Sequence, residues 1–257
     1  FWSWSKIKIK NPIFIVGCCH SGNSLMLVIL GSHYSIAPIP EETAVFYKSH
    51  WEIKKAINNF ERSCLQVGKN RFVEKTPNHI FKINRIFDYY PDGKIILMLR
   101  DGRDVVCSIK ASDYLATMKP IKKDFTLAVD TWVNANLEGY KYWDHPGVKV
   151  VKYEDLISRP QETLEGCMEF LEEDHTDSML EYHVESKKWF GAEELVKPKQ
   201  IDNLQDHKKL RNWQVNQPLF DGRGRWRKEM NPESKKIFKE KAQEYLVKFG
   251  YVEDSYW

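Results

Sequence analysis

The feature that most constrains the fold is a short apolar run that leads through a glycine-containing loop into a second apolar run. Residues 13–16 are apolar and mostly β-branched, and Gly17 ends them. Such a run is typical of a strand buried on both faces. Residues 25–30 are all apolar, so the helix that they predict is also buried. This strand–loop–helix unit is therefore expected at the centre of the fold.

The loop between the two runs keeps the spacing of a phosphate-binding loop. In such loops, backbone N–H groups and the N-terminus of the following helix receive an anion. The candidate contacts in this loop are Gly17, Cys19, His20, Ser21, Gly22, Asn23 and Ser24. Nucleoside triphosphatases carry a phosphate-binding lysine where this chain has Asn23, which bears no charge. The loop is thus predicted to hold a phosphate without splitting ATP. A tight turn with no ligand is the simpler alternative.

Charge and hydropathy exclude some classes of protein. The 257 residues include 39 Lys and Arg against 36 Asp and Glu, a net charge of +3, which does not favour a general nucleic-acid binder. The basic cluster at 222–228 can still hold a small polyanion. No apolar run reaches membrane-spanning length.

The cysteines lead to an expectation about location. Their number, five, is odd and their spacing shows no metal pairs, which favours a reducing compartment and hence the cytoplasm. The Golgi lumen is the alternative if an anchor precedes Phe1. The eight histidines have no metal-ligand spacing either, so no metal is predicted.

Apolar strands alternate with helices along a chain that no break in composition divides. This alternation predicts an α/β fold of three layers, with a mostly parallel central sheet, helices on both faces and a single domain over 1–257. We expect strands over 71–75, 94–99 and 148–152, and an exposed or edge strand over 1–10. We expect helices over 43–67, over 77–90 with Thr76 as N-cap, after the cap Asp124, up to Leu171 with a capping box formed by Ser158 and Gln161, and after Asn231.

Six segments carry motifs in the order of one enzyme family. They are the loop 17–24, Glu41-Glu42-Thr43, Glu74-Lys75-Thr76-Pro77, the stretch 100–108, Lys152-Tyr153-Glu154-Asp155-Leu156 and Gly224-Arg225-Trp226. In these motifs the chain resembles the sulfotransferases that use 3′-phosphoadenosine 5′-phosphosulfate (PAPS). Among them it is most similar to the branch that contains bacterial enzymes and tyrosylprotein sulfotransferases.

The resemblance implies contacts with both charged ends of PAPS. The loop 17–24 is expected to hold the 5′-phosphosulfate, and Arg100 and Ser108 the 3′-phosphate. Arg225 is expected to close over the nucleotide, with Tyr153 near it. Arg100 ends a predicted strand and Ser108 lies about two turns into the next helix, so both can face one crevice. A surface ion pair with a neighbouring aspartate is the alternative for Arg100, and core packing for Tyr153.

Two loop positions depart from the family pattern. The family often has Arg or Lys at the position of His20 and Thr at the position of Asn23. A histidine donates more strongly to a phosphate oxygen when it is protonated, so a pH dependence of donor binding is expected.

The same resemblance implies the catalytic residues. Lys75, at a strand-to-helix junction, is similar to the lysine that stabilises the leaving oxygen, and Glu42 to the general base. A free glutamate has a pKa of roughly 4.3, so proton transfer must come late, as the S–O bond forms. Glu41 is the alternative base. An acidic helix N-terminus without catalytic function is the simpler explanation of both glutamates.

The leading prediction is therefore a sulfotransferase that moves a sulfuryl group from PAPS to a hydroxyl. The alternatives are a small-molecule kinase with a phosphate-binding loop and an inactive module that binds 3′-phosphoadenosine 5′-phosphate (PAP). The acceptor class stays open among carbohydrates, tyrosine, lipids and small alcohols. Residues 175–220, with Trp189, Phe190 and Trp213, are expected to shape its pocket. Aromatic residues at both chain ends leave room for a homodimer.

Overall fold

The computed structural model describes residues 9–111, 124–184, 187, 189–190, 195–199 and 204–257. Its five strands form one sheet in the order β2-β3-β1-β4-β5, and all four neighbouring pairs are parallel. The strands are β1 (Ile13–Gly17), β2 (Ile36–Ile39), β3 (Arg71–Lys75), β4 (Lys94–Leu99) and β5 (Val148–Lys152). The predicted α/β fold is confirmed, with β1 at the centre as the apolar run at 13–16 indicates.

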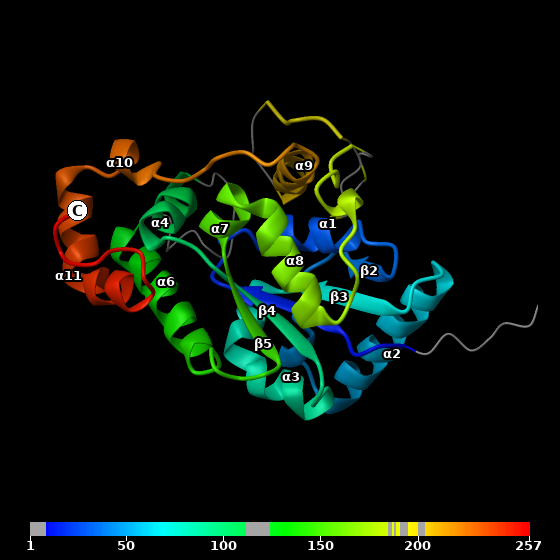
Figure 1. Ribbon diagram of the computed structural model, residues 1–257. Coiled ribbons are helices and arrows are strands. Elements are labelled where there is room, and N and C mark those ends of the chain that lie inside the picture. Colours follow the sequence, from blue (N-terminus) through cyan, green and yellow to red (C-terminus); the bar gives the residue numbers. More distant parts are fainter. Residues whose placement is uncertain (1–8, 112–123, 185–186, 188, 191–194, 200–203) are drawn as a thin grey trace, which may run out of the picture.

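Alternate side chains of the central strands enter two separate cores, as the period of a strand requires. Phe14 and Val16 of β1 belong to one core, and Ile13 and Ile15 to the other. Helices α1 (Asn23–Gly31) and α8 (Pro160–Leu171) cover the second core, and α2 (His50–Gln66), α3 (Ile83–Tyr89), α4 (Gly102–Ala111), α6 (Phe125–Tyr140) and α11 (Pro232–Lys248) cover the first. Figure 1 shows α8 across the sheet from the α6 and α11 layer. The sheet is thus covered on both faces.

The chain order places a crevice at the carboxyl end of the sheet. Strands β1 and β4 are neighbours, but α1 follows β1 on one face and α4 follows β4 on the other. In open α/β sheets, ligands bind where consecutive connections diverge in this way. The loop 18–22 and Arg100 both lie at that point. The helix α9 (Leu204–Val215) lies beside α1 at the same end (Figure 1).

Two predicted elements differ from the structure near the acidic motif. The helix expected over 43–67 is confirmed from His50 to Gln66 as α2, but its expected start is wrong, because a short 3₁₀ turn, η1 (Val45–Tyr47), precedes α2 and the chain is extended between them. Ser49 and Glu52 form a reciprocal capping box that starts α2. Strand β2 was not predicted, because its Pro38 suggested an interruption. An edge strand tolerates the missing N–H of a proline, since it pairs on one side only.

Predicted caps met with different outcomes. Asp124 accepts a hydrogen bond from the Thr126 N–H, which confirms this cap, and the last helix begins after Asn231 as expected, with Asn231 accepting from the Ser234 N–H. The capping box at Ser158 is wrong, because this hydroxyl donates to the Glu154 carbonyl, within the short helix α7 (Tyr153–Ser158), and α8 begins separately at Pro160. The predicted helix 77–90 is a 3₁₀ helix, η2 (Pro77–Lys82), followed by α3. Thr76 precedes η2 but makes no cap hydrogen bond.

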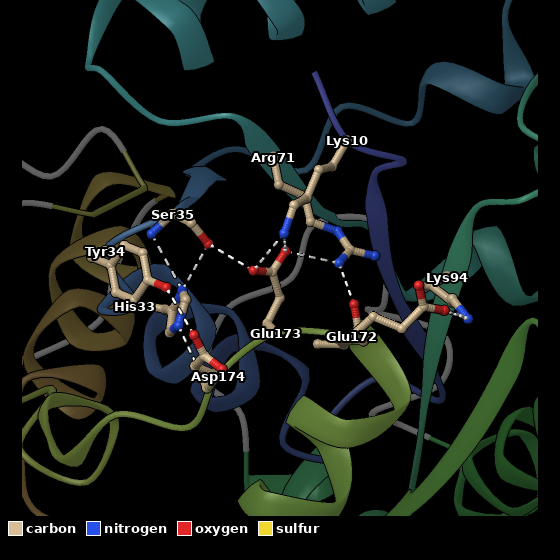
Figure 2. A network of polar contacts seen from close by, with 10 residues as sticks. Lys10, His33, Tyr34, Ser35, Arg71, Lys94, Glu172, Glu173 and Asp174 are labelled. Atoms are coloured by element: carbon tan, nitrogen blue, oxygen red, sulfur yellow. Dashed lines mark hydrogen bonds and ion pairs between the residues drawn. The ribbon is translucent and has the colours of Figure 1, made fainter. Parts of the chain in front are cut away.

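A buried polar network closes the amino end of the sheet (Figure 2). Arg71, the first residue of β3, donates to the Glu173 carboxylate, which also accepts from Lys10 and Ser35. The network joins the start of β3 to the chain that follows α8. Most of the strand predicted over 1–10 lies outside the described residues, and Ile9 and Lys10 are not in a strand.

Other sequence expectations concern the thiols, the membrane and the chain ends. All five cysteine thiols are free. Within the described part of the chain, none of the helices combines the length and the apolar character that a membrane crossing requires. The C-terminal Trp257 packs edge-to-face on Trp226 and Phe238 of its own chain.

Candidate active site

A pocket of about 590 Å³ opens at the carboxyl end of the sheet. Four segments supply most of its lining: the loop after β1 with the start of α1, residues 76–78, one side of α9, and the chain from Pro218 to Arg225. The predicted site residues on its wall are Cys19, His20, Gly22, Asn23, Ser24, Glu42, Arg100, Ser108, Tyr153 and Arg225. Gly17 and Ser21 lie in the loop but not on the wall.

The loop depends on two glycines for different reasons. A Cβ at Gly17 would lie 2.5 Å from the Met98 carbonyl oxygen, so only glycine allows β1 to approach β4 there. Gly22 has φ 92°, a left-handed conformation that other residues rarely adopt, at the position just before α1. The Asn23 amide donates to the Cys18 carbonyl at 2.8 Å and closes the loop. Asn23 therefore has a structural role in addition to its place on the wall.

His20 lies in the loop with φ 64° and connects it to α4. Its Nδ1 is 3.0 Å from the Ser108 hydroxyl. His20 was expected to contact the 5′-phosphosulfate and Ser108 the 3′-phosphate, and the two side chains lie together. Burial, and then the nearby Arg100, lower the pKa of His20 to about 4. His20 is therefore neutral near pH 7 in the free protein.

Arg100 holds two distant segments together at the end of β4. Its guanidinium donates to the carbonyls of His20 at 3.0 Å and of Gly222 at 2.9 Å, and stacks on the Tyr153 ring at 4.2 Å. The surface ion pair considered for Arg100 is therefore wrong. Arg103 instead pairs with Asp101 at 2.7 Å, and this ion pair is buried. The Nε atom of Arg100 is buried and has no hydrogen-bond partner among the residues that the structure describes.

One buried carboxylate holds the basic cluster at 222–228 beside the pocket. Asp104, in the first turn of α4, accepts hydrogen bonds from the backbone N–H of Gly224 at 2.7 Å and of Trp226 at 3.1 Å. Arg225 between them lines the pocket and pairs with Glu229. A segment near the chain's end is thereby fixed opposite the loop after β1.

A buried lysine faces the one carboxylate of the pocket wall among the described residues. The Lys75 side chain, at the end of β3, is 1% exposed, and its Nζ lies 2.5 Å from Oε1 of Glu42, whose side chain is 42% exposed. Burial, and then the charge of Arg211, lower the pKa of Lys75 to about 8, although Glu42 opposes them. Burial alone would raise the pKa of Glu42, but Lys75 and Arg211 bring it below its usual value. Both groups are therefore charged at pH 7.

A second carboxylate positions the segment that carries Glu42. Glu74 is fully buried and accepts from the hydroxyls of Thr43 at 2.7 Å and Thr76 at 2.6 Å, with His79 at 3.1 Å on its other oxygen. The Thr76 hydroxyl in turn accepts from the Thr43 backbone N–H. The position of Glu42 relative to Lys75 follows from these bonds. Glu41 is exposed and does not line the pocket.

Arg211 and His207 on α9 line the pocket and were not predicted. Arg211 Nη2 donates to Ser24 Oγ and to Glu42 Oε1, both at 3.0 Å. The spacing of 207, 211 and 214 is that of one helix face, which is the signal that was available in the region expected to shape the acceptor pocket.

The predicted acceptor aromatics have a different role. Trp189 and Phe190 are core residues, 8% and 3% exposed, because they pack under α9 rather than on the pocket wall. Phe190 contacts Arg211 and Lys75 with its ring, at 4.2 and 5.4 Å from the ring centre. Trp213 also lies off the wall, with Lys197 over its ring. The region 175–220 thus reaches the pocket through Tyr182, α9 and the segment 218–220.

The described residues contain no group of three or more His, Cys, Asp or Glu side chains that could hold a metal ion. The wall instead concentrates arginine and histidine around one carboxylate. Such a lining suits an anionic organic molecule.

Comparisons with known proteins agree with this geometry. The chain is 26% identical over 208 residues to an uncharacterized protein of Aquifex aeolicus, covering 68% of this chain and 27% of that one. It is 24% identical over 231 residues to a protein-tyrosine sulfotransferase of Drosophila melanogaster, covering 75% of this chain and 46% of that one. The chain spans between 27% and 60% of the length of the curated relatives that it matches.

Solved structures match over a larger share of the chain. A mouse sulfotransferase complexed with PAP superimposes with a TM-score of 0.59 at 14% identity, covering 93% of this chain and 86% of that one. The profile described as the sulfotransferase family matches residues 48–177, which is half of the sequence and includes β3, β4, β5 and the helices between them. The chain belongs to the sulfotransferase family.

Proposed function

We propose that this chain transfers a sulfuryl group from PAPS to the hydroxyl of an acceptor. The observation that carries the proposal is the Lys75–Glu42 pair at the end of β3, buried on the lysine side and open to the pocket on the glutamate side. An amine and a carboxylate so placed suit a reaction in which one oxygen gains negative charge as another loses a proton.

Buried polar groups with no protein partner support the binding of PAPS. Ser21 Oγ in the loop and Arg100 Nε at the end of β4 are both buried and unpaired among the described atoms. Native proteins rarely leave such groups unsatisfied, so each is a candidate contact for a ligand or an ordered water. The loop residues and the N-terminus of α1 would hold the phosphosulfate. Arg100, Ser108 and Arg225 would hold the 3′-phosphate, with Tyr153 stacked beneath Arg100.

The roles of the charged pair follow from their protonation states. Bound PAPS supplies the sulfuryl group, whose bond to the phosphate oxygen breaks as a bond to the acceptor oxygen forms. Glu42, ionised at pH 7, receives the acceptor's proton. Lys75, protonated below its pKa of about 8, stabilises the charge left on the phosphate oxygen.

A specific observation disfavours the kinase alternative. The position of a phosphate-binding lysine is occupied by Asn23, whose amide bonds to the loop's own Cys18 carbonyl. The inactive module stays as the second candidate, because a protein that binds PAP needs the same wall without the chemistry.

The test begins with binding. Calorimetric titration of the purified chain with PAP is expected to show binding, while ATP with Mg²⁺ shows much weaker heat. Wild type, Arg100→Ala and Arg159→Ala are compared, since Arg159 forms only exposed ion pairs away from the pocket. Arg100→Ala is expected to weaken PAP at least tenfold, about the effect of one lost charge-assisted bond, and Arg159→Ala is expected to leave it unchanged.

Transfer is then measured with radiolabelled PAPS against phenols, sugars, lipids and small alcohols. Labelled product with any acceptor supports the enzyme. PAP binding without transfer to any of them favours the inactive module, and tighter binding of ATP than of PAP contradicts the proposal.

A further inference from the structure

Arg211 joins the two halves of the candidate site. It lies on α9, and its Nη2 donates both to Ser24, in the first turn of α1, and to Glu42. Ser24 belongs to the loop proposed for the phosphosulfate, and Glu42 is the proposed base. The guanidinium therefore spans the interval between the donor side and the acceptor side of the pocket.

The surroundings of Arg211 hold its charge in place. The guanidinium stacks on the buried Phe190 ring at 4.2 Å, and the side chain is 23% exposed. A planar guanidinium on an aromatic ring keeps few orientations, and its five N–H groups form a fixed fork that matches oxyanions. Partial burial makes its charge more effective than a solvated one.

The direction of the reaction places the sulfuryl group beside this fork. In an in-line transfer, the sulfur atom lies between the leaving and attacking oxygens, and charge is spread over its other three oxygens. The leaving oxygen belongs to the Ser24 side and the attacking oxygen to the Glu42 side. A side chain that bonds both sides in the free protein is therefore within reach of the sulfuryl oxygens.

We propose that Arg211 is a further catalytic residue, which binds the sulfuryl oxygens of PAPS during transfer. This inference rests on the proposed function. In the step, the S–O bond to the phosphate breaks, the S–O bond to the acceptor forms, and the acceptor proton moves to Glu42. Arg211 neither gains nor loses a proton.

The contact of Arg211 with Glu42 predicts that the base becomes stronger once the donor is bound. Lys75 and Arg211 both contact the same oxygen, Oε1, of Glu42 in the free protein. Transfer of the Arg211 hydrogen bond from this oxygen to a sulfuryl oxygen leaves Glu42 with one cation fewer. Arg211 lowers the pKa of Glu42 by its charge, so its withdrawal makes the carboxylate a better proton acceptor.

The test compares two nucleotides that differ only in the sulfuryl group. PAPS carries it and PAP lacks it, so calorimetry without acceptor reports contacts to that group apart from activity. Arg211→Ala is expected to weaken PAPS about tenfold and PAP by less than about twofold. Its kcat is expected to fall about 100-fold, as on loss of one oxyanion donor, and Arg211→Lys is expected to recover part of this loss. Lys208→Ala, which removes the same charge from α9 off the pocket wall, is the matched control.

Thermal unfolding of each variant shows whether α9 still packs. If Arg211→Ala melts early, Arg211→Lys supplies the comparison, because it keeps the charge but not the planar fork. Equal weakening of PAPS and PAP, or no change in either, would show that Arg211 only ties α9 to α1 and would overturn the inference. If the wild type binds neither nucleotide, the proposed function and this inference both fail. If the wild type binds both nucleotides and the Arg211 variant is unaffected, the inference alone fails.

Discussion

Strand β3 carries a buried cation at each end, and the two differ in how exposed their carboxylate partners are. Arg71 at the amino end is 3% exposed, and its partner Glu173 is equally buried and also bonds Lys10 and Ser35 (Figure 2). Lys75 at the carboxyl end is as deeply buried, but its partner Glu42 is 42% exposed in a pocket. One strand thus holds a closed ionic cluster and an open one.

The closed cluster contributes to the stability of the fold, whereas the open cluster belongs to the candidate active site. A larger hollow, about 880 Å³, lies at the amino end beside Lys10, Arg71 and Lys94, yet these cations already have carboxylate partners. Each end keeps buried atoms that have no partner among the described residues, Asn70 Oδ1 and Arg71 Nε at the amino end and Ser21 Oγ and Arg100 Nε at the carboxyl end. The ends differ instead in the carboxylate partner: the Glu173 side chain is 3% exposed, whereas the Glu42 side chain is 42% exposed in the pocket, so the pair at the carboxyl end is the one that a ligand can reach. The ends of β3 can be tested against each other.

The largest effect is expected from Lys75→Ala. Loss of the ammonium group that stabilises the leaving oxygen is expected to lower kcat about 1,000-fold, with little change in PAP affinity. Transfer of radiolabel from PAPS measures kcat, and calorimetry measures the affinity for PAP. Lys94→Ala, at the start of β4, is expected to stay within about twofold of wild type, because its ion pair with exposed Glu172 is a surface one. Equal turnover by Lys75→Ala and wild type would remove Lys75 from the mechanism.

Arg71→Ala is expected to have the opposite effect from Lys75→Ala: it lowers the stability of the fold and leaves the site unchanged. It leaves Glu173 buried with Lys10 as its remaining cation, so the free energy of unfolding should fall by about 3 kcal/mol, near the lower end for a broken buried pair. Urea denaturation measures this change, and PAP affinity of the folded fraction should not move. Arg159→Ala is the control with exposed partners, for which little loss is expected. An Arg71 variant of normal stability but weak PAP binding would mean that the two ends are not separate in function.

Glu42→Gln is expected to lower kcat about 100-fold, because the amide keeps the shape of the side chain but cannot take a proton. The Michaelis constant for PAPS should change little. Glu41→Gln is the matched control, one residue away and exposed, and is expected to behave as wild type. The reverse ranking of the two variants would assign the base to Glu41.

The smallest effect is a pH dependence that sharpens the comparison. Lys75 acts as the protonated amine, and its pKa of about 8 in the free protein means that kcat/KM should fall by about tenfold for each pH unit above that value. On the acid side, kcat/KM should fall only below the ordinary pKa of a glutamate, because the pKa of Glu42 is lowered. His20 should contribute nothing near neutrality, since its pKa is about 4. A profile that stays flat to pH 10 would contradict the role of Lys75.

Much of the framework was accessible from local sequence patterns. The strand at 13–17, the strands that start at Arg71, Lys94 and Val148, the cap at Asp124 and the helix start after Asn231 follow from apolar runs and capping chemistry. These signals involve only a few neighbouring residues, so they can be recognised in the sequence without knowledge of the fold. The start of the helix expected over 43–67 was placed too early, because the capping box at Ser49 was overlooked. Strand β2 failed because the edge position that tolerates its proline is a property of the sheet.

The sequence alone determined the α/β class, the loop after the first strand and the motif residues, because each depends on neighbours along the chain. Only the tertiary structure placed Lys75 against Glu42, fixed Glu74 behind them, and brought Arg211 to a carboxylate 169 residues away in the sequence. Such contacts depend on which elements pack together and on which polar groups burial leaves without water. Neither is encoded in the spacing of residues along one segment.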